Sequence, residues 1–324
     1  MTPAPARSSE RVQVVAGVLR DAEGRILLAQ RPAGKHLAGT WEFPGGKREP
    51  GESAPAALAR ELAEELGIRV ESVSPWLTLT HAYPEIVVRL QLYTVDGWHG
   101  RPHGCEGQSL KWVTNTEMHS LPMPAADRPI VRAFTIDDRY AITPDPRESE
   151  GRESLLDWAR AALGRGIRLF QLRAKSLDET ALAGLGREFG RLMAEADARW
   201  LLNGPPELAA EVGADGVHLD AARLNRLPAR PLSGEFLVAA SCHDEAALAR
   251  AGELALDFVT VSPVQPTASH PGADTLGWDG FGCLCRCSPL PVFALGGVTP
   301  ADLPLAREHG GFGVAGIRAF GLQS

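Results

Sequence analysis

Cysteine is scarce in this sequence, and an excess of positive charge is absent. Only five of the 324 residues are cysteines, and their uneven spacing does not suit a disulfide framework. Lysine and arginine total 33 against 40 aspartates and glutamates, so the formal net charge is −7. Nucleic-acid polymers and anionic membranes are bound by basic surfaces. We therefore expect neither as a partner, whereas a small phosphorylated ligand stays open.

Long apolar runs are also missing. No run of about eighteen apolar residues occurs, and the opening "MTPAPARSSER" has no apolar core of the kind that export signals carry. The sequence thus predicts no membrane span and a cytoplasmic protein. Three cysteines lie together in "CLCRC" (283–287), where we expect a helix, but no second Cys or His pair follows at the spacing of a metal site. This favours reduced thiols over bound metal.

The patterns that are present predict two domains. Residues 11–134 mix alternating strands such as "VQVVAGVL" with a patterned helix after Gly51, which is typical of an α+β domain. Over residues 138–324, eight short continuous apolar runs alternate with helical segments, as in parallel strands buried on both faces. Eight such units predict an α/β (β/α)₈ TIM barrel with little chain left for a last helix. Residues 1–10 are predicted to be a disordered tail.

The helix after Gly51 has well-defined ends and one apolar face. Ser53 is suited to cap its start, and Gly67 is suited to end it. Leu58, Leu62 and Leu66 recur at spacing four and predict the buried stripe.

Three glutamates, Glu61, Glu64 and Glu65, lie side by side on the adjoining face of this helix. Like charges three or four residues apart each cost about 0.2–0.5 kcal/mol. Taken alone, they favour a solvated acidic face. The preceding "FPGGK" supplies a glycine turn whose backbone can approach a metal or phosphate closely. Clustered carboxylates are what Mg²⁺ needs, so the combination predicts a metal–pyrophosphate site.

The stretch from Gly46 through Glu52 to "RELAEELGI" fills the fixed positions of the Nudix hydrolase box, and "RILLAQRPAGKHLAGTWEFPGGK" resembles the MutT branch, which clears 8-oxo-dGTP from the nucleotide pool. The resemblance covers residues 11–132 and implies a Nudix fold with Mg²⁺ or Mn²⁺ as cofactor. It implies metal ligands at Gly45 (through its carbonyl), Glu61, Glu64, Glu65 and Glu106. It implies nucleotide contacts at Arg31, His36, Glu42, Phe43, Pro44, Gly45 and Asp127.

The implied reaction converts 8-oxo-dGTP and water into the monophosphate and pyrophosphate. Glu61 is the expected general base, with Glu106 as the alternative, and Glu52 is expected to orient the loop. Asp127 stands where the pattern has the asparagine that reads the oxidised guanine, and an ionised aspartate would repel the base carbonyl unless protonated. The pattern's preceding Asp-Arg pair is replaced by Glu85 and Ile86. Another nucleotide, or a thiamine-pathway pyrophosphate, therefore remains an alternative substrate.

In a (β/α)₈ barrel, functional groups follow the carboxyl ends of the strands. The segments "ALGGVT" and "AGIRAF" suit a phosphate held by backbone N–H groups. The polar residues and glycines that the pattern places at this end, and that we expect to line a pocket, are Arg173, Lys175, Asn203, His218, Ser241, His243, Ser262, Gly296 and Gly297.

The motifs "QLRAK", "ADGVHL", "SCHDEAA" and "FALGGV" resemble thiamine-phosphate synthase and its TenI relatives. Three departures stand out: Gly204 replaces one magnesium aspartate, Arg223 replaces the other, and residues 267–270 read Thr-Ala-Ser-His where the family has a Thr-x-Thr-Lys phosphate loop. We therefore expect a barrel that binds a thiazole or thiamine-pathway phosphate without synthase activity. His243 is placed like the proton-transferring histidine of the TenI tautomerases. A phosphate sensor and a thiazole tautomerase are both open.

Overall fold

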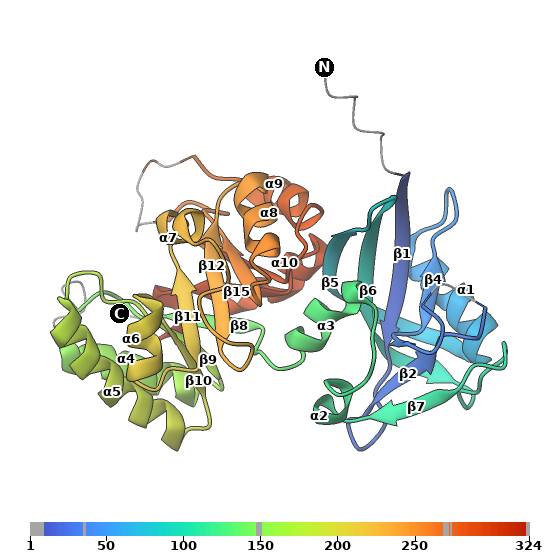
Figure 1. Ribbon diagram of the computed structural model, residues 1–324, viewed down its shortest axis with the longest axis horizontal. Helices are drawn as coiled ribbons and strands as arrows, with labels where there is room; N and C mark the ends of the chain where they lie inside the picture. Colours follow the sequence, from blue (N-terminus) through green and yellow to red (C-terminus); the bar gives the residue numbers. More distant parts are fainter. Residues whose placement is uncertain (1–9, 35–36, 147–150, 268–271, 273, 322–324) are drawn as a thin grey trace. The chain divides into compact units, whose positions relative to one another are not determined.

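The computed structural model describes residues 10–34, 37–146, 151–267, 272 and 274–321. The chain divides into two compact units, Met1–Val131 and Arg132–Ser324 (Figure 1). The predicted tail lies outside the described residues except for Glu10, which begins the first strand. No helix among the described residues is long and apolar enough to cross a membrane.

The N-terminal unit contains a mixed four-stranded sheet, in the order β4-β1-β6-β5, and an antiparallel three-stranded sheet, β3-β2-β7. In the first sheet β1 runs parallel to β6 and antiparallel to β4. The strands are β1 (Glu10–Val18), β2 (Ile26–Gln30), β3 (Trp41–Glu42), β4 (Gly45–Lys47), β5 (Arg69–Ala82), β6 (Ile86–His99) and β7 (Leu110–Val113). The helices are α1 (Ala54–Leu66), α2 (Asn115–Met118), η1 (Ala125–Asp127) and α3 (Arg128–Ala133).

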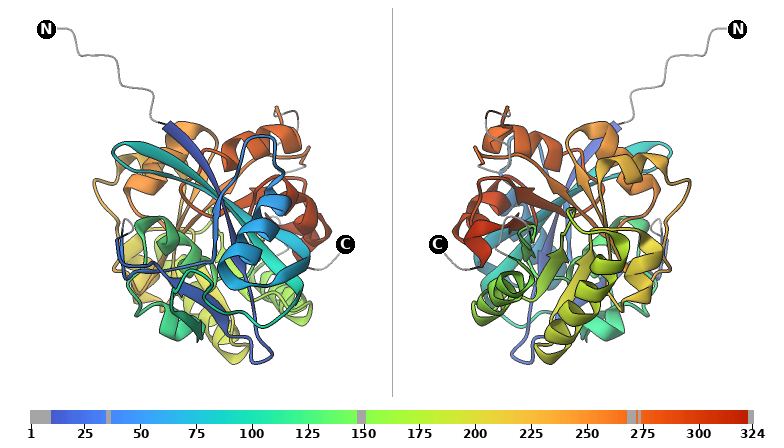
Figure 2. Two further views of the ribbon diagram at one scale, coloured as in Figure 1. Left: turned by 90° about the vertical axis from the view of Figure 1, so that its right-hand side faces the viewer. Right: turned by 90° about the vertical axis from the view of Figure 1, so that its left-hand side faces the viewer.

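The predicted acidic helix is α1, and its ends follow from the residues expected to make them. The Ser53 hydroxyl accepts a hydrogen bond from the Ala56 N–H at 3.3 Å. Gly67 adopts the left-handed conformation with φ 65°, which lets its N–H close the helix. The three stripe leucines are fully buried against β1 and its neighbours, which contributes roughly 2 kcal/mol each. The left view of Figure 2 looks onto this helix, drawn in light blue.

The C-terminal unit is a closed barrel of eight parallel strands, in the order β8-β9-β10-β11-β12-β13-β14-β15. All eight predicted apolar runs are confirmed as strands, and the right view of Figure 2 looks onto helices that surround them. The strands are β8 (Arg139–Ile142), β9 (Leu169–Leu172), β10 (Arg199–Leu202), β11 (Gly216–Leu219), β12 (Leu237–Cys242), β13 (Phe258–Val261), β14 (Val292–Leu295) and β15 (Gly313–Gly316).

The barrel's helices are α4 (Arg152–Gly164), α5 (Glu179–Glu195), α6 (Pro206–Glu211), α7 (Ala221–Arg226), α8 (Glu245–Glu253), α9 (Gly277–Cys285) and α10 (Leu303–Glu308), with η2 (Pro300–Asp302) and η3 (Arg318–Phe320). After β15 the described chain forms only the short turn η3, as the remaining length predicted. Helix α9 contains the first two cysteines of "CLCRC", and all five cysteines of the chain are free thiols.

Candidate active sites

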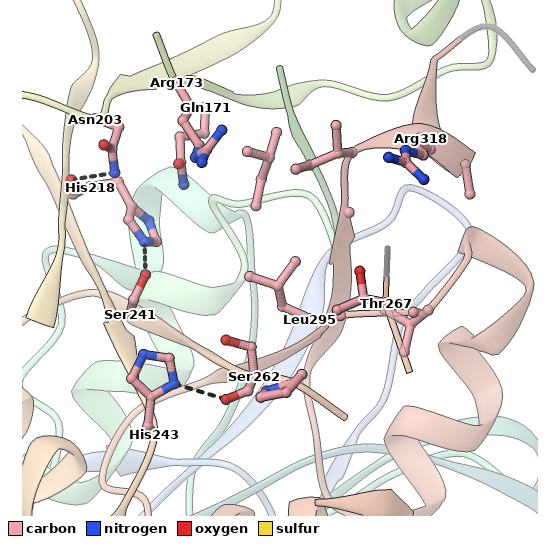
Figure 3. Close-up of a pocket in the computed structure, with 18 of the residues that line it drawn as sticks. Gln171, Arg173, Asn203, His218, Ser241, His243, Ser262, Thr267, Leu295 and Arg318 are labelled. Atoms are coloured by element: carbon pink, nitrogen blue, oxygen red, sulfur yellow. Dashed lines mark hydrogen bonds between the residues drawn. The ribbon is translucent and has the colours of Figure 1, made fainter. Parts of the chain in front are cut away.

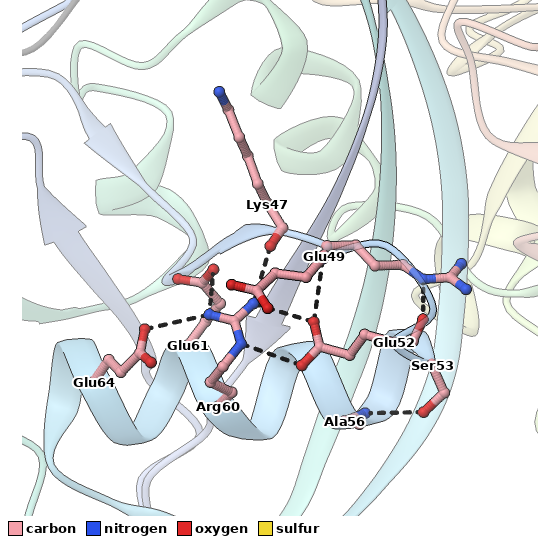
Figure 4. A network of polar contacts seen from close by, with 9 residues as sticks. Lys47, Glu49, Glu52, Ser53, Ala56, Arg60, Glu61 and Glu64 are labelled. Atoms are coloured by element: carbon pink, nitrogen blue, oxygen red, sulfur yellow. Dashed lines mark hydrogen bonds and ion pairs between the residues drawn. The ribbon is translucent and has the colours of Figure 1, made fainter.

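Arg60 joins the loop before α1 to the acidic face of the helix (Figure 4). Its guanidinium donates to both carboxylate oxygens of Glu52, at 3.1 and 3.2 Å, and to the Lys47 carbonyl at 3.1 Å. It also donates to Glu61 at 2.9 Å and to Glu64 at 3.2 Å. These contacts fix the loop on the helix and offset the repulsion between neighbouring glutamates. The arrangement is consistent with the orienting role predicted for Glu52.

Glu65 lies apart from this network, at the edge of the glycine turn. Its Oε2 accepts a hydrogen bond from the Gly45 N–H at 3.2 Å. The pKa of Glu65 is raised to about 7, chiefly by burial; the hydrogen bond from Gly45 lowers it, and the nearby charges of Glu61, Glu42 and Glu106 raise it by smaller amounts. Carboxylates from α1, β3 and a distant loop are thus close enough to disfavour one another's ionised forms.

The two glycines of the turn are required by close approach. Gly45 has a φ of +148°, and a Cβ there would lie 2.2 Å from the Val15 carbonyl oxygen. A Cβ on Gly46 would lie 2.3 Å from the carboxyl carbon of Glu61. The Glu61 carboxylate therefore rests directly on the turn, where a side chain would displace it.

The loop of Glu106 is attached to the end of α1 through the main chain. The Cys105 N–H donates to the Glu65 carbonyl at 3.0 Å, and the Gln108 amide donates to the same oxygen at 2.8 Å. The Gln108 side-chain oxygen accepts from the Glu106 N–H at 2.8 Å. Gln108 is a positioning residue that the sequence did not reveal, because a polar residue in a loop gives no sign of burial.

The predicted metal ligands share the right chemistry, but they are not gathered into one cluster. Within the described part of the chain, no three His, Cys, Asp or Glu side chains form a group that could hold a metal ion. Glu61 and Glu64 turn toward Arg60, the nearest strong counter-charge. The site nevertheless fits a hard divalent cation. It offers carboxylate oxygens that repel one another around Glu65, beside a glycine turn whose backbone can be approached closely. The five-residue ligand set stays a prediction.

Two of the predicted nucleotide contacts, Arg31 and Glu42, lie close enough to Asp127 to affect its pKa. Arg31, which directly follows β2, pairs with Glu42 of β3 at 2.5 Å, and the charges of both affect Asp127. Burial, assisted by Glu42 and opposed by Arg31, raises the pKa of Asp127 to about 8. At neutral pH its carboxyl is therefore mainly protonated and offers one donor and one acceptor, as an amide does. Tyr83, which the sequence did not single out, hydrogen-bonds to the backbone beside Asp127.

The other predicted nucleotide contacts differ in exposure. Phe43 is 4% exposed and Pro44 is also buried, so packing accounts for much of their surface. His36 lies outside the described residues. These three remain predictions as nucleotide contacts.

The carboxyl ends of the barrel strands enclose a pocket of about 540 Å³ (Figure 3). All nine residues that the strand ends were predicted to contribute line it, so the structure brings them together. The lining includes three cationic side chains, Arg173, Lys175 and Arg318, and one carboxylate, Asp220. The pocket is therefore a positively charged cavity suited to an anion.

Magnesium does not fit this pocket. Among its described lining residues, Asp220 is the single carboxylate, and Arg223 pairs with it at 2.7 Å. Gly204 has no side chain to offer, and a Cβ there would meet Leu202 at 3.1 Å. Because a hard divalent cation needs several oxygen ligands, the charge of the lining favours direct phosphate contacts instead. Thr267 lines the pocket, while residues 268–270 of the predicted phosphate loop lie outside the described chain.

His243 is held in one orientation at the pocket wall. Its Nδ1 lies 2.8 Å from the Ser262 carbonyl oxygen, which can only accept, so Nδ1 carries a proton. In the neutral ring this leaves Nε2 with a free lone pair. His243 is thus arranged as a base or hydrogen-bond acceptor.

The acidic helix over a glycine turn in a mixed sheet defines a Nudix hydrolase domain, and the closed parallel barrel with its pocket at the strand ends defines a TIM barrel. The chain belongs to the Nudix family, which it matches over residues 15–133, and to the family described as thiamine monophosphate synthase, which it matches over residues 139–320.

Three relatives illustrate the two halves. A CTP pyrophosphohydrolase of Escherichia coli is 40% identical over 123 residues, covering 38% of this chain and 90% of the relative. An 8-oxo-dGTP diphosphatase of the same organism is 34% identical over 122 residues, covering 38% of this chain and 95% of the relative. A Geobacter sulfurreducens protein, provisionally named a thiamine-phosphate synthase, is 38% identical over 182 residues, covering 56% of this chain and 84% of the relative.

Proposed function

We propose that the N-terminal unit is a Mg²⁺-dependent pyrophosphohydrolase that converts 8-oxo-dGTP to 8-oxo-dGMP and pyrophosphate. The observation on which this rests is the carboxylate Glu65, which is surrounded by Glu61, Glu42 and Glu106 beside the glycine turn. A site that gathers negative charge at a turn open to close approach is suited to a metal–pyrophosphate complex. The similarity to the Escherichia coli 8-oxo-dGTP diphosphatase supports the same reaction.

When bound, Mg²⁺ or Mn²⁺ supplies positive charge for the phosphate oxygens and makes a water molecule more acidic. Glu61, Glu64, Glu65, Glu106 and the Gly45 carbonyl would hold it. Glu61, whose carboxylate rests on Gly46, takes the proton from the attacking water, with Glu106 as the alternative base. The ion pair between Arg60 and Glu52 keeps the loop in place when Glu61 and Glu64 turn from Arg60 to the metal.

The neutral carboxyl of Asp127 accounts for recognition of the base. It can accept from N7–H of 8-oxoguanine and donate to O6 with its own proton. The same carboxyl can accept from the amino group of cytosine and donate to N3. CTP is therefore a second candidate substrate, favoured by Asp127 and by the similarity to the CTP pyrophosphohydrolase.

The test is a substrate panel with the full chain and Mg²⁺. It compares 8-oxo-dGTP, dGTP, CTP and thiamine diphosphate, with monophosphate and pyrophosphate measured as products. We expect pyrophosphate release to be fastest with 8-oxo-dGTP; CTP as the best substrate would select the second candidate. Release of orthophosphate from the triphosphates, or no turnover with Mg²⁺ or Mn²⁺, would contradict the proposed reaction.

We propose further that the barrel binds a phosphomonoester, such as a phosphorylated thiazole, without metal and does not make thiamine phosphate. Joining a pyrimidine diphosphate to a thiazole requires pyrophosphate to leave, and carboxylate-held Mg²⁺ would neutralise the developing charge. Among its described lining residues, the pocket offers one carboxylate, Asp220, already paired with Arg223, and three cationic side chains. Those cations and the backbone near Gly296 and Gly297 suit a monophosphate.

The full chain, given both synthase substrates and Mg²⁺, should yield no thiamine phosphate above background. Steady turnover would contradict this proposal. Adding a thiazole phosphate to the hydrolysis assay then separates two roles. A changed hydrolysis rate indicates a sensor, whereas an unchanged rate with isomerisation of the thiazole indicates a tautomerase in which His243 moves the proton.

A further inference from the structure

A series of hydrogen-bonded polar side chains runs from the barrel interior to the pocket, and Figure 3 shows its last contact, between His218 and Ser241. The Gln171 amide nitrogen lies 3.1 Å from the Tyr140 hydroxyl, which lies 3.2 Å from Nδ1 of His218. Nε2 of His218 lies 2.9 Å from the Ser241 hydroxyl. Gln171, Tyr140 and His218 are at most 2% exposed, and Gln171 and His218 contribute with Ser241 to the lining of the pocket. None of these contacts serves the hydrolysis proposed for the N-terminal unit.

Every donor in this series of hydrogen bonds finds an acceptor if all the bonds are donated from Gln171 toward Ser241. An amide N–H₂ only donates, so the Tyr140 oxygen accepts from Gln171. The Tyr140 O–H then needs an acceptor, and among the described residues this is Nδ1 of His218, at 3.2 Å. With Nδ1 accepting, the ring proton is on Nε2 and is donated to the Ser241 oxygen. With the Gln171 amide nitrogen toward Tyr140, the reverse direction would leave the Tyr140 O–H buried without an acceptor, which costs about 1–3 kcal/mol.

His218 is suited to this fixed role because it stays neutral. The residue is 1% exposed, and its pKa is lowered to about 3, chiefly by burial, with a smaller opposing effect of Asp220 and a small further lowering by Lys175. A ring with a single proton has one donor and one acceptor nitrogen, so the direction of the series also determines its tautomer.

We propose that Gln171, Tyr140 and His218 act as positioning residues that keep the Ser241 oxygen occupied as an acceptor, so that the Ser241 O–H is directed to a hydrogen-bond acceptor of the ligand. The proposal rests on the barrel's proposed function as a phosphomonoester site, and an anionic phosphate oxygen is the strongest acceptor of this kind. The pocket floor would accordingly discriminate against a ligand that presents an N–H or O–H at this position.

The tautomer of His218 is the direct test. In the full chain labelled with ¹⁵N-histidine, the ring nitrogens of His218 should show an unprotonated Nδ1 and a protonated Nε2, with no titration between pH 5 and 8. A protonated Nδ1 would mean that the Gln171 amide is reversed and Ser241 donates to His218, which would overturn the proposal. Titration near the ordinary histidine pKa would overturn it as well.

Variants separate positioning from packing. Tyr140→Phe removes the O–H aimed at Nδ1, so the tautomer of His218 should become mixed and the affinity for inorganic phosphate should fall about three- to tenfold. Thr260→Val is the matched control. Thr260 is on β13, opposite Ser241 of β12, and is fully buried. Its hydroxyl has no hydrogen-bond partner in the described structure. It should change neither quantity.

The outcomes distinguish the positioning proposal from the proposal that the barrel binds a phosphomonoester. Failure of the wild type to bind phosphate would contradict the barrel's proposed function, while the His218 tautomer would still decide the direction of the series. If Tyr140→Phe keeps both the tautomer and the phosphate affinity of the wild type, the positioning role is wrong.

Discussion

The two candidate sites, both proposed to bind phosphate groups, have opposite charges. Beside α1, burial and, to a smaller extent, the neighbouring carboxylates raise the pKa of Glu65 to about 7. In the barrel, Arg173, Lys175 and Arg318 line the pocket with a carboxylate that is already paired. The first site fits an added cation, and the second has its positive charge built in. The difference teaches that a negatively charged site and a positively charged site can both be suited to phosphate. The negative site requires a divalent cation, whereas the positive one does not.

Glu65→Gln should have the largest effect. It removes a predicted metal ligand at the centre of the acidic site, so hydrolysis should fall by orders of magnitude, about a hundredfold or more, while the fold is kept. Glu71→Gln on β5 is the control and should stay near the wild-type rate. Phosphate binding by the barrel should be unaffected. A near-normal rate of Glu65→Gln at low Mg²⁺ would remove the basis for the metal site.

A chelator should separate the two sites without any mutation. EDTA should abolish nucleotide hydrolysis and leave the affinity of the full chain for inorganic phosphate within about twofold, because a hard cation is required only where carboxylates have to be bridged to phosphate. Phosphate binding is measured by calorimetry in the presence and absence of the chelator. Loss of phosphate binding with EDTA would show that the barrel too relies on a metal.

The buried carboxyl of Asp127 should make stability depend on pH. Its folded-state pKa of about 8 lies above the ordinary value, so the folded state holds the proton more tightly than the unfolded state. The contribution of the protonated Asp127 carboxyl to the free energy of unfolding is fully present below about pH 4 and is lost as the pH rises toward 8. Asp127→Asn should flatten that part of the profile and raise the free energy of unfolding at pH 8 by a few kcal/mol. Urea unfolding at several pH values measures it; an unchanged profile would contradict the raised pKa.

The smallest effect should be that of Asp127→Asn on selectivity at neutral pH. A neutral carboxyl and an amide offer the same pair of hydrogen bonds, so the ratio of kcat/KM for 8-oxo-dGTP over dGTP should change by less than about tenfold at pH 7. Above pH 8 the aspartate ionises and the variant should gain the advantage. A large difference already at pH 6 would show that Asp127 is charged when the nucleotide binds.

Local patterns made much of the fold predictable. The eight barrel strands are fully buried, so their apolar runs are continuous and could be recognised one by one. Helix α1 could be bounded because Ser53 and Gly67 act within one turn of its ends. Strand β5 has no such clear pattern: its first half is polar and largely exposed, and Pro75 interrupts the alternation.

The sites were less predictable, because a single sequence does not show which way a polar residue points. His218 was expected only as one of several polar strand ends, whereas the structure makes it a buried link between Tyr140 and Ser241. Asp220 follows the same strand, but its place in the pocket and its pairing with Arg223 depend on the course of the backbone. The protonation of Asp127 depends on burial beneath segments far away in the sequence.

The attachment of the Glu106 loop bears on how this enzyme can change over evolutionary time. Its links to the end of α1 include two main-chain N–H groups, those of His103 and Cys105, and a single side chain, Gln108. Main-chain bonds do not depend on which side chain is present. The exposed positions of the loop are therefore free to diversify while Glu106 keeps its distance from Glu65, so selection on substrate preference can act there without disturbing the acidic site.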